Sequence, residues 1–342
     1  MPSSRWIRRI ALMWLIGLIS ISSVWSQSKP VKRFEYYHDQ MGTAFKLIFY
    51  APLSKREAQQ LADSAFAVIN QCNDALSDYR SYSELNRLCL QADSQQWVAV
   101  SRLLYEVLDQ SAHWHETSEG LFDISMGHLT KLYRRAIRRS ELPDAQSIRS
   151  AHQRSGARQI LLDPTTCAVS LNRRQMRLDL GGIAKGYSVQ MAMDKLAQLG
   201  ITQALLDGGG DIVIGDPPPE QQGWDIRSPI IHTDSAGKTW HLRNCAIATS
   251  GDAYQYLEIE GVRYSHIIHP TSGLPLTRSC QVTVVAPNGA DADALATIFS
   301  LVSPEARFRF LEKPEIRSKV HSLYIQTETD DWIWHNRLPL EP

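Results

Sequence analysis

The sequence predicts an α+β fold in a single domain, with mixed or antiparallel sheets and flanking helices. The first half of the chain carries long segments with apolar residues three and four positions apart, whereas the second half carries short apolar runs broken by glycines. The proline run at residues 217–219 is too short to be a domain linker. With 342 residues, of which 43% are hydrophobic, the chain can bury a large core, and this composition excludes disordered, collagen-like and polytopic membrane proteins.

Residues 1–26 have the pattern of a signal peptide. Three arginines among the first nine residues precede an uncharged apolar stretch, Ile10–Ile21, and polar, mostly small residues follow it. Because this stretch is shorter than the roughly 20 residues of a membrane-spanning helix, we expect cleavage after Ser26 and a mature domain over residues 27–342. The first cysteine is Cys72, so the lipobox of a lipoprotein is absent. We therefore expect an exported protein.

The first half of the mature domain is predicted to begin with two strands and to continue with helices. Phe34–Tyr50 contains Gly42 and alternates over Ala44–Tyr50, which predicts strand, turn, strand. Ser101 has the position of an N-cap. The predicted helices cover Ser54–Leu76, Arg102–Glu116, Leu129–Arg139 and Asp144–Arg154.

The second half is predicted to be rich in strands. One helix is expected over Ile183–Leu199, closed by Gly200, and a last one runs from about Asp293 to Val302. The predicted strands are Gln159–Leu162 and Ala168–Leu171, which form a hairpin, then Met176–Leu180, Gln203–Leu206, Asp211–Ile214, Trp240–Thr249, Tyr256–Ile259 and Gln281–Ala286.

The charges balance, with 36 lysines and arginines against 36 aspartates and glutamates. A net charge of zero provides no long-range field for a polyanion, so we expect no nucleic-acid partner. Four arginines at helical spacing, Arg134, Arg135, Arg138 and Arg139, are interpreted as a solvated helix face.

The cysteines predict neither a zinc site nor a disulfide framework. They are widely spread, without a CxxC pair and without a Cys/His cluster at zinc spacing. We interpret them as small buried apolar residues. They are Cys72, Cys89, Cys167, Cys245 and Cys280.

Two glycine-rich segments suggest close approach of a ligand or of another backbone segment. Asp179–Tyr187 places two glycines before a helix, where backbone amides and the Lys185 ammonium favour an anion. The spacing is neither that of a P-loop nor that of a dinucleotide fold, and close packing of helix against strand explains the glycines equally well. Asp207–Asp211 repeats the pattern, and a tight turn is the alternative there.

Two further segments carry chemistry. Asp293 and Thr297 lie four residues apart on one helix face, and their oxygens could bind Mg²⁺, whereas capping of the helix by Asp291 or Asp293 is the structural alternative. His266 and His269 precede a turn, and either could accept a proton near neutral pH or serve only in packing.

Taken in order, these segments resemble the ApbE family, the FAD:protein FMN transferases. The resemblance covers about residues 33–325. The matching blocks are Met41–Thr43, Leu76–Tyr79 followed by Ser83–Leu85, Glu119–Asp123, Asp179–Tyr187, Gly208–Asp211, Thr249–Asp252, Tyr264–Ile268 and Asp293–Thr297.

The resemblance implies a periplasmic enzyme, either in solution after signal cleavage or held at the inner membrane, that depends on Mg²⁺ and uses FAD as its substrate. It implies transfer of the FMN half of FAD to a threonine (or serine) hydroxyl of a partner protein, with release of AMP. The implied partners are membrane or secreted redox subunits, such as those of sodium-pumping quinone reductases (Nqr) and Rnf-type complexes. Peripheral contact with the membrane is compatible with such partners.

The resemblance also implies residue roles. Asp293, Thr297 and the backbone carbonyl of Gly182 correspond to the metal ligands. His266 corresponds to a residue beside the pyrophosphate and is our expected base for the acceptor hydroxyl, with Asp252 as a second choice. The residues expected to line the FAD site are Met41, Tyr79, Leu121, Phe122, Asp123, Asp179, Lys185 and His266.

One departure from the family pattern concerns the histidines. The family usually has His-x-x-Asp-Pro where this chain has His266-Ile-Ile-His269-Pro270, which makes His269 a rival base. Two other functions stay open at this point. Water could replace the protein hydroxyl, so that FAD is hydrolysed to FMN and AMP, or the protein could be a periplasmic flavin-binding protein without turnover.

Overall fold

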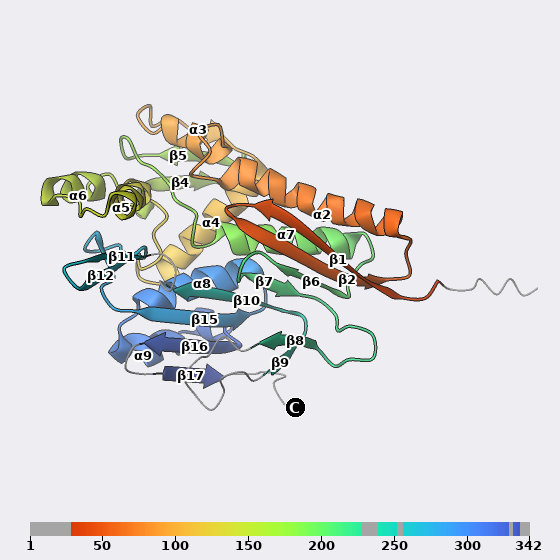
Figure 1. The fold of residues 1–342 in the computed structure, drawn as a ribbon. Coiled ribbons are helices and arrows are strands. Elements are labelled where there is room, and N and C mark those ends of the chain that lie inside the picture. The colour runs from red at the N-terminus through yellow and green to blue at the C-terminus, as the bar shows by residue number, and fades with distance from the viewer. Residues whose placement is uncertain (1–28, 228–238, 252–255, 328–330, 336–342) are drawn as a thin grey trace, which may run out of the picture.

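The computed structural model describes residues 29–227, 239–251, 256–327 and 331–335, so the predicted signal peptide lies outside the described residues. A large antiparallel sheet forms the centre of the molecule (Figure 1). Its strands, in spatial order, are β1 (Lys32–Gln40), β2 (Thr43–Ala51), β6 (Ala204–Asp207), β7 (Ile212–Ile214), β10 (Cys245–Gly251), β15 (Cys280–Ala286), β16 (Ser322–Thr327) and β17 (Asp331–His335).

Alternating side chains give this sheet two buried faces. On β10, Ala246 and Ala248 belong to the main core, whereas Cys245 and Ile247 belong to a second cluster on the opposite face. The main core is covered by α2 (Lys55–Leu76), α7 (Ala184–Gln198) and α8 (Gly289–Leu301). The second cluster is covered by a two-stranded ribbon of β8 (Trp224–Arg227) and β9 (Thr239–Leu242).

Local capping explains where several helices begin. Ser54 and Glu57 form a capping box at the start of α2. The predicted N-cap at Ser101 is confirmed, because its side chain accepts a hydrogen bond from the Leu104 amide. The remaining helices are α3 (Glu84–Leu90), α4 (Arg102–Thr117), α5 (Gly127–Arg139), α6 (Ala145–His152), α9 (Arg307–Leu311) and α10 (Pro314–Arg317), with short 3₁₀ turns at Ala157–Gln159 and Pro304–Ala306.

The other strands form small sheets at the edges of the molecule. The predicted hairpin is confirmed as part of a sheet ordered β3-β5-β4, with β3 (Val98–Ala99), β4 (Ile160–Asp163) and β5 (Ala168–Leu171). At one end, α5 and α6 lie beside the pair β11 (Tyr256–Ile259) and β12 (Val262–Ser265) (Figure 1). The last pair is β13 (Ile268–His269) and β14 (Leu274–Pro275).

The predicted strand at Met176–Leu180 is wrong. Met176, Leu178 and Leu180 are buried, which satisfies the apolar alternation, but the segment has no partner strand. Its contacts are a single parallel bridge from Arg177 to Met126 and hydrogen bonds to neighbouring loops. Burial in the core, and not sheet pairing, therefore explains the pattern.

Two other element boundaries differ from the prediction. The strand expected over Trp240–Thr249 is two strands, because β9 ends at Leu242 and β10 begins at Cys245. The last long helix begins at Gly289 and not at Asp293, since the Asn288 side chain caps it by accepting from the Asp291 amide. Asp293 is thereby left free of a capping role.

Four of the five cysteines are buried and the fifth, Cys167, is half-buried, in line with their interpretation as small apolar residues. None of the helices in the described part of the chain has the length and hydropathy of a membrane span.

Candidate active site

A cavity of about 460 Å³ lies where the start of α7 and one face of α8 meet α5 and several loops. Its lining comes from segments between Asp78 and Leu301, so that the fold brings distant parts of the sequence together. The lining includes most of the residues expected from the sequence, namely Tyr79, Leu121, Phe122, Asp123, Asp179, Gly182, Lys185, His266, Asp293 and Thr297.

The three residues expected to bind a metal lie in one corner of this cavity. Gly182 is so close to Thr297 that a methyl group on its Cα would lie 2.9 Å from the Thr297 hydroxyl oxygen and 3.2 Å from the Phe122 ring. Thr297 follows Asp293 by one turn of α8. A carboxylate, a hydroxyl and the backbone of a glycine therefore converge here, and their role as ligands stays a prediction.

Asp293 is almost fully buried at the junction of the two helices. Its Oδ2 accepts a hydrogen bond of 3.0 Å from the backbone amide of Gly186, in the first turn of α7. Burial raises the pKa of Asp293 well above its usual range, and the nearby Asp211 raises it further, while Lys185 acts in the opposite direction. A positive charge beside this carboxylate would favour its ionised form.

Lys185 and Asp211 form an ion pair beside Asp293, with 3.1 Å between Nζ and Oδ2. Burial would lower the pKa of Lys185, but the carboxylates of Asp211 and Asp293 outweigh burial and raise it. Burial likewise raises the pKa of Asp211, and Lys185 offsets part of that effect. Apart from this ion pair, Asp211 Oδ2 receives no well-aligned hydrogen bond within the described part of the chain, so it keeps capacity for a further cationic partner.

The two helices can meet at this point because both carry a glycine. A methyl group on Gly186 would lie 2.1 Å from the carbonyl oxygen of Gly289, and one on Gly289 would lie 2.2 Å from the carbonyl oxygen of Gly186. Both distances are far below van der Waals contact. Gly186, within the segment Asp179–Tyr187, therefore allows the close packing of α7 against α8. This packing places Asp293 beside the amides at the start of α7.

These residues fit a divalent cation with hard oxygen ligands. The described residues contain no group of three or more His, Cys, Asp or Glu side chains arranged for a metal ion. A cation at this corner would therefore rest on Asp293, Thr297 and the Gly182 carbonyl, with other positions left to water and substrate phosphate, as is usual for Mg²⁺. Within the described residues, the buried carboxylates of Asp211 and Asp293 have one ammonium group beside them, that of Lys185. This arrangement favours an additional positive charge.

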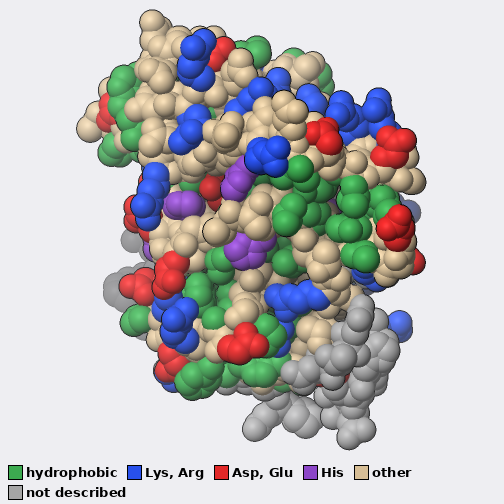
Figure 2. All heavy atoms as spheres, turned by 90° about the vertical axis from the view of Figure 1, so that its left-hand side faces the viewer, with side chains coloured by type: hydrophobic (Ala, Val, Ile, Leu, Met, Phe, Trp, Pro, Cys, Tyr) green, Lys and Arg blue, Asp and Glu red, His purple; other side chains and the backbone are tan. Residues whose placement is uncertain are grey.

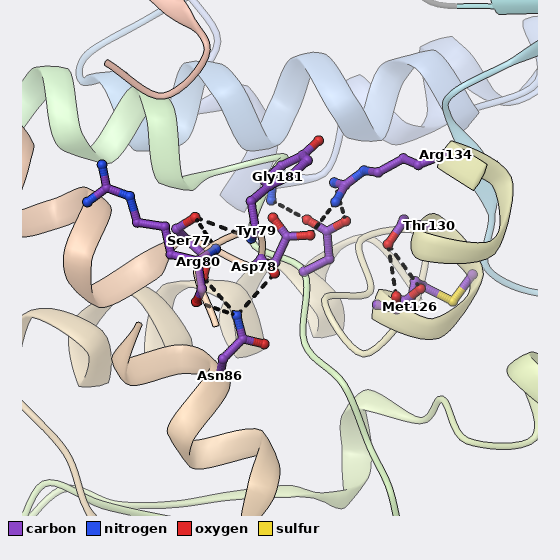
Figure 3. A network of polar contacts seen from close by, with 11 residues as sticks. Ser77, Asp78, Tyr79, Arg80, Asn86, Met126, Thr130, Arg134 and Gly181 are labelled. Carbon is purple, nitrogen blue, oxygen red and sulfur yellow. Dashed lines mark hydrogen bonds and ion pairs between the residues drawn. The ribbon is translucent and has the colours of Figure 1, made fainter. Parts of the chain in front are cut away.

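A second polar network lines the same cavity and was not predicted from the sequence. Arg134 of α5 donates to the carboxylates of Asp78 and Asp179, the latter at 2.8 Å, and its guanidinium lies 4.3 Å from the centre of the Tyr79 ring (Figure 3). Asp179 also accepts a hydrogen bond of 2.8 Å from the Gly181 amide. The network thus joins α5, the segment after α2 and the glycine turn before α7.

Arg134 corrects one interpretation of the sequence. Arg135, Arg138 and Arg139 are exposed, as expected for a solvated face, but Arg134 points into the cavity and is ion-paired. The sequence spacing places all four arginines on one helix and does not separate Arg134 from the others. What separates it is its pairing with two carboxylates, which other segments of the chain contribute.

Asp78 has an unusual pKa within this network. Burial and the nearby Asp179 carboxylate raise its pKa to about 6, although Arg134 acts in the opposite direction. The sequence block Leu76–Tyr79 contained Asp78, but its acid–base behaviour depends on a neighbour 101 positions away in the sequence, which spacing cannot reveal.

The wall formed by Leu121, Phe122 and Asp123 is fixed by its own loop. The Phe122 amide donates to the Ser118 hydroxyl at 2.8 Å, and the Phe122 carbonyl accepts from His115 at 2.8 Å. Asp123 accepts from the amide of Ser125 at 2.7 Å and from its hydroxyl at 2.5 Å. The wall is therefore held by hydrogen bonds before any ligand binds.

The remaining expected residues are distributed differently. His266 lines the cavity, whereas His269 is not among the lining residues, and its Nδ1 accepts a hydrogen bond of 3.3 Å from the Thr271 amide. Met41 lies in the turn between β1 and β2, with φ of 51°, and the cavity lining does not include it. Asp252 lies outside the described residues.

Hard oxygen donors, a half-buried ammonium group and an aromatic wall in one cavity are typical of enzymes that bind a phosphate-containing ligand with a divalent cation. The sequence model of the ApbE family matches residues 41–320. The chain belongs to the ApbE family, which confirms the resemblance found in the sequence.

Relatives and solved structures agree with this assignment. The chain is 28% identical over 308 residues to the FAD:protein FMN transferase of Vibrio cholerae serotype O1, covering 89% of this chain and 91% of the relative. It is 30% identical over 304 residues to the protein of that name from Treponema pallidum, covering 83% and 84%. The solved structure of the flavin transferase ApbE from Vibrio cholerae has a TM-score of 0.78 and 26% identity, covering 90% of this chain and 97% of that one. The predicted α+β fold is thus confirmed.

Proposed function

We propose that this chain transfers the FMN half of FAD to a threonine (or serine) hydroxyl of a target protein and releases AMP, in a reaction that depends on Mg²⁺. The observation that carries the proposal is the convergence of Gly182, Thr297 and Asp293 beside Lys185 in one cavity. The printed names of the relatives, FAD:protein FMN transferase, support the same reaction.

The cavity offers a different surface to each part of FAD. The Lys185 ammonium and the amides at the start of α7 favour the pyrophosphate. Leu121, Phe122 and Tyr79 provide apolar and aromatic surface for a flat ring system. FAD bound in this way would have its phosphates beside the oxygen donors of α8.

The reaction breaks the phosphoanhydride bond of FAD and forms a phosphate ester with the acceptor. The acceptor hydroxyl oxygen attacks the phosphorus on the riboflavin side, and a new P–O bond forms while the bond from that phosphorus to the bridging oxygen breaks. AMP leaves with the bridging oxygen. Mg²⁺, when bound, neutralises the pyrophosphate and the departing phosphate.

His266 takes the proton of the acceptor hydroxyl in this proposal. It lines the cavity, and a histidine with a pKa near neutrality can act as a general base. Asp252 is the second choice for a base or an orienting carboxylate. His269, the rival base, is the weaker candidate because it does not line the cavity.

We further propose that the chain works in the periplasm after removal of residues 1–26. The basic start, the short apolar stretch and the small residues before Ser26 support export. The proposed acceptors are flavin-carrying redox subunits of the Nqr or Rnf type, or other secreted flavoproteins, which exported chains can reach, and peripheral membrane contact would suit such subunits.

Product analysis separates transfer from the two alternatives. The mature protein is incubated with FAD, Mg²⁺ and the purified flavin-carrying domain of an Rnf-type subunit. Free AMP is then measured, together with flavin fluorescence that stays on the acceptor in a denaturing gel. Transfer gives both signals. Release of AMP and FMN without labelled acceptor would favour hydrolysis, and neither signal would favour a flavin-binding protein.

A further inference from the structure

A second cavity, of about 530 Å³, lies between α5 and α6 on the outer side of the active site. We call it the basic groove, and we define it by Lys131, Arg135 and Arg138 of α5 and by Arg154 after α6. The acidic residue in its lining is Asp144, which caps α6 by accepting from the amide and the hydroxyl of Ser147 at 2.8 and 2.6 Å.

The four cations of the basic groove lack a carboxylate partner within the part of the chain that the structure describes. Among the described residues, none of the four forms an ion pair with a carboxylate. Their field acts on His128 at the edge of the groove, whose pKa is lowered by burial and further by Arg154, Arg177 and Lys131. Since the whole chain has zero net charge, this positive region is local.

The helix that forms the basic groove also forms part of the active site. Thr130, Tyr133, Arg134 and Ile137 of α5 line the active-site cavity, one helix face away from the groove. The α5–α6 pair also packs against the segment after His266. Leu129 and Ala151 share a small core with Ile268, and His152 Nε2 donates to the Pro270 carbonyl at 2.7 Å. A partner held in the groove would therefore lie next to the cavity.

Figure 2 looks onto the end of the molecule that carries α5, α6 and the β11–β12 pair. Lysine and arginine side chains are gathered over the upper half of this face, at the height of α5 and α6. A concave site between two helices suits an extended or helical chain segment better than a flat lipid surface, which would meet only the rims.

We propose that the basic groove is the docking site for an acidic segment of the acceptor protein, which holds the acceptor while its hydroxyl enters the active site. This inference rests on the proposed function and adds the recognition of the partner. The complementary charges would act mainly on the encounter and on the affinity for the acceptor, and little on the chemical step.

Charge reversal in the basic groove tests the inference. The variant Arg135→Glu/Arg138→Glu is compared with Lys55→Glu/Arg56→Glu, which reverses two exposed charges at the start of α2, at the other end of the molecule (Figure 1). The variant Arg135→Gln/Arg138→Gln removes the two positive charges without introducing negative ones, and it controls for a folding defect caused by charge reversal. We expect about a tenfold higher KM for the acceptor domain in the groove variant, with kcat and FAD affinity unchanged and the α2 control like wild type.

A binding experiment without FAD keeps this inference separate from the proposed function. Two fluorescent peptides of equal length carry a threonine flanked by aspartates or by asparagines. The aspartate peptide should bind wild type and the α2 control, should bind the groove variant at least about tenfold more weakly, and should lose affinity in salt. Equal binding of both peptides, or unchanged binding to the groove variant, would overturn the docking site.

Two further outcomes are decisive. If wild type labels no acceptor, the proposed function fails, while the peptide result still decides on the groove. If instead the groove arginines bind phosphatidylglycerol vesicles and not the aspartate peptide, the groove is a membrane contact and the inference is overturned.

Discussion

The backbone amide of Gly186 donates a hydrogen bond of 3.0 Å to the Asp293 carboxylate, and this bond joins the first turn of α7 to α8. The bond orients a buried carboxylate whose second oxygen remains for another partner. It also depends on the contact between Gly186 and Gly289, without which the helices could not approach. The geometry of the predicted metal corner is therefore set by helix packing.

Asp293→Asn should separate metal binding from folding. Transfer should fall about a hundredfold or more because a neutral amide is a poor ligand for Mg²⁺. The metal-free protein should keep its free energy of unfolding, since the pKa of Asp293 is raised by burial and the substitution removes an unfavourable buried charge. Initial rates at increasing Mg²⁺ and thermal melts in a chelator measure the two effects. Wild-type rates in the variant would exclude Asp293 as a ligand.

Two glycine variants should affect different properties. Gly186→Ala places a methyl group 2.1 Å from the Gly289 carbonyl oxygen, so we expect a loss of about 1–3 kcal/mol or more in the free energy of unfolding. Gly182→Ala places its methyl group 2.9 Å from the Thr297 hydroxyl, a side chain that can rotate away. It should cost less stability but weaken Mg²⁺ dependence and transfer. Denaturant melts and transfer rates are measured for both variants. A larger loss of stability in Gly182→Ala than in Gly186→Ala would contradict this geometry.

The two histidines provide a matched pair. His266→Ala should retain FAD binding but lose transfer, because its side chain lines the cavity where the acceptor hydroxyl would be deprotonated. His269→Ala should transfer at close to the wild-type rate, since His269 does not line the cavity. Equilibrium binding of FAD and single-turnover labelling measure both variants. Undiminished transfer by His266→Ala would exclude His266 as the base.

The raised pKa of Asp78 should make stability depend on pH in an unusual direction. Between the ordinary value of 3.8 and about 6, the unfolded chain has released this proton while the folded protein still holds it. The Asp78 contribution therefore falls as the pH rises through this interval, by up to about 3 kcal/mol. It is present below that interval and lost above it.

Asp78→Asn should remove this dependence. The difference in free energy of unfolding between variant and wild type, measured from about pH 4 to about pH 7, should change in favour of the variant as the pH rises. Taking the difference cancels the opposite slopes of carboxylates such as Glu35, whose pKa is lowered to about 2 mainly by its hydrogen bond with Tyr37. A difference that does not vary with pH would show that folding leaves the pKa of Asp78 at its ordinary value.

The sequence predicted the helices and strands well where residues within the segment itself determine the structure, as caps and apolar spacing do. Ser101 caps its helix as predicted, and the apolar spacing over Ser54–Leu76 gives the face of α2 that is buried. The strand prediction for Met176–Leu180 was wrong because alternating apolar residues indicate only that one side of a segment is buried. A loop that is buried in the core has the same pattern as a strand.

The site was predicted in part. Motif order located Gly182, Lys185, Asp293 and Thr297, which the fold brings to one corner. Arg134 could not be recognised, since its two carboxylate partners come from other segments and only the folded chain brings them together. The motif at Met41 belongs to the turn between β1 and β2, outside the lining of the cavity.

The mass of the acceptor tests the central claim most directly. The acceptor domain is incubated with FAD, Mg²⁺ and either wild type or Asp293→Asn, and its intact mass is measured before and after, with an acceptor whose target threonine is replaced by valine as the control. We predict that the acceptor gains the mass of FMN, less one water, with the wild-type enzyme and not with Asp293→Asn. The gain should require the target threonine. An unchanged acceptor mass with folded, FAD-binding wild-type protein would contradict the account.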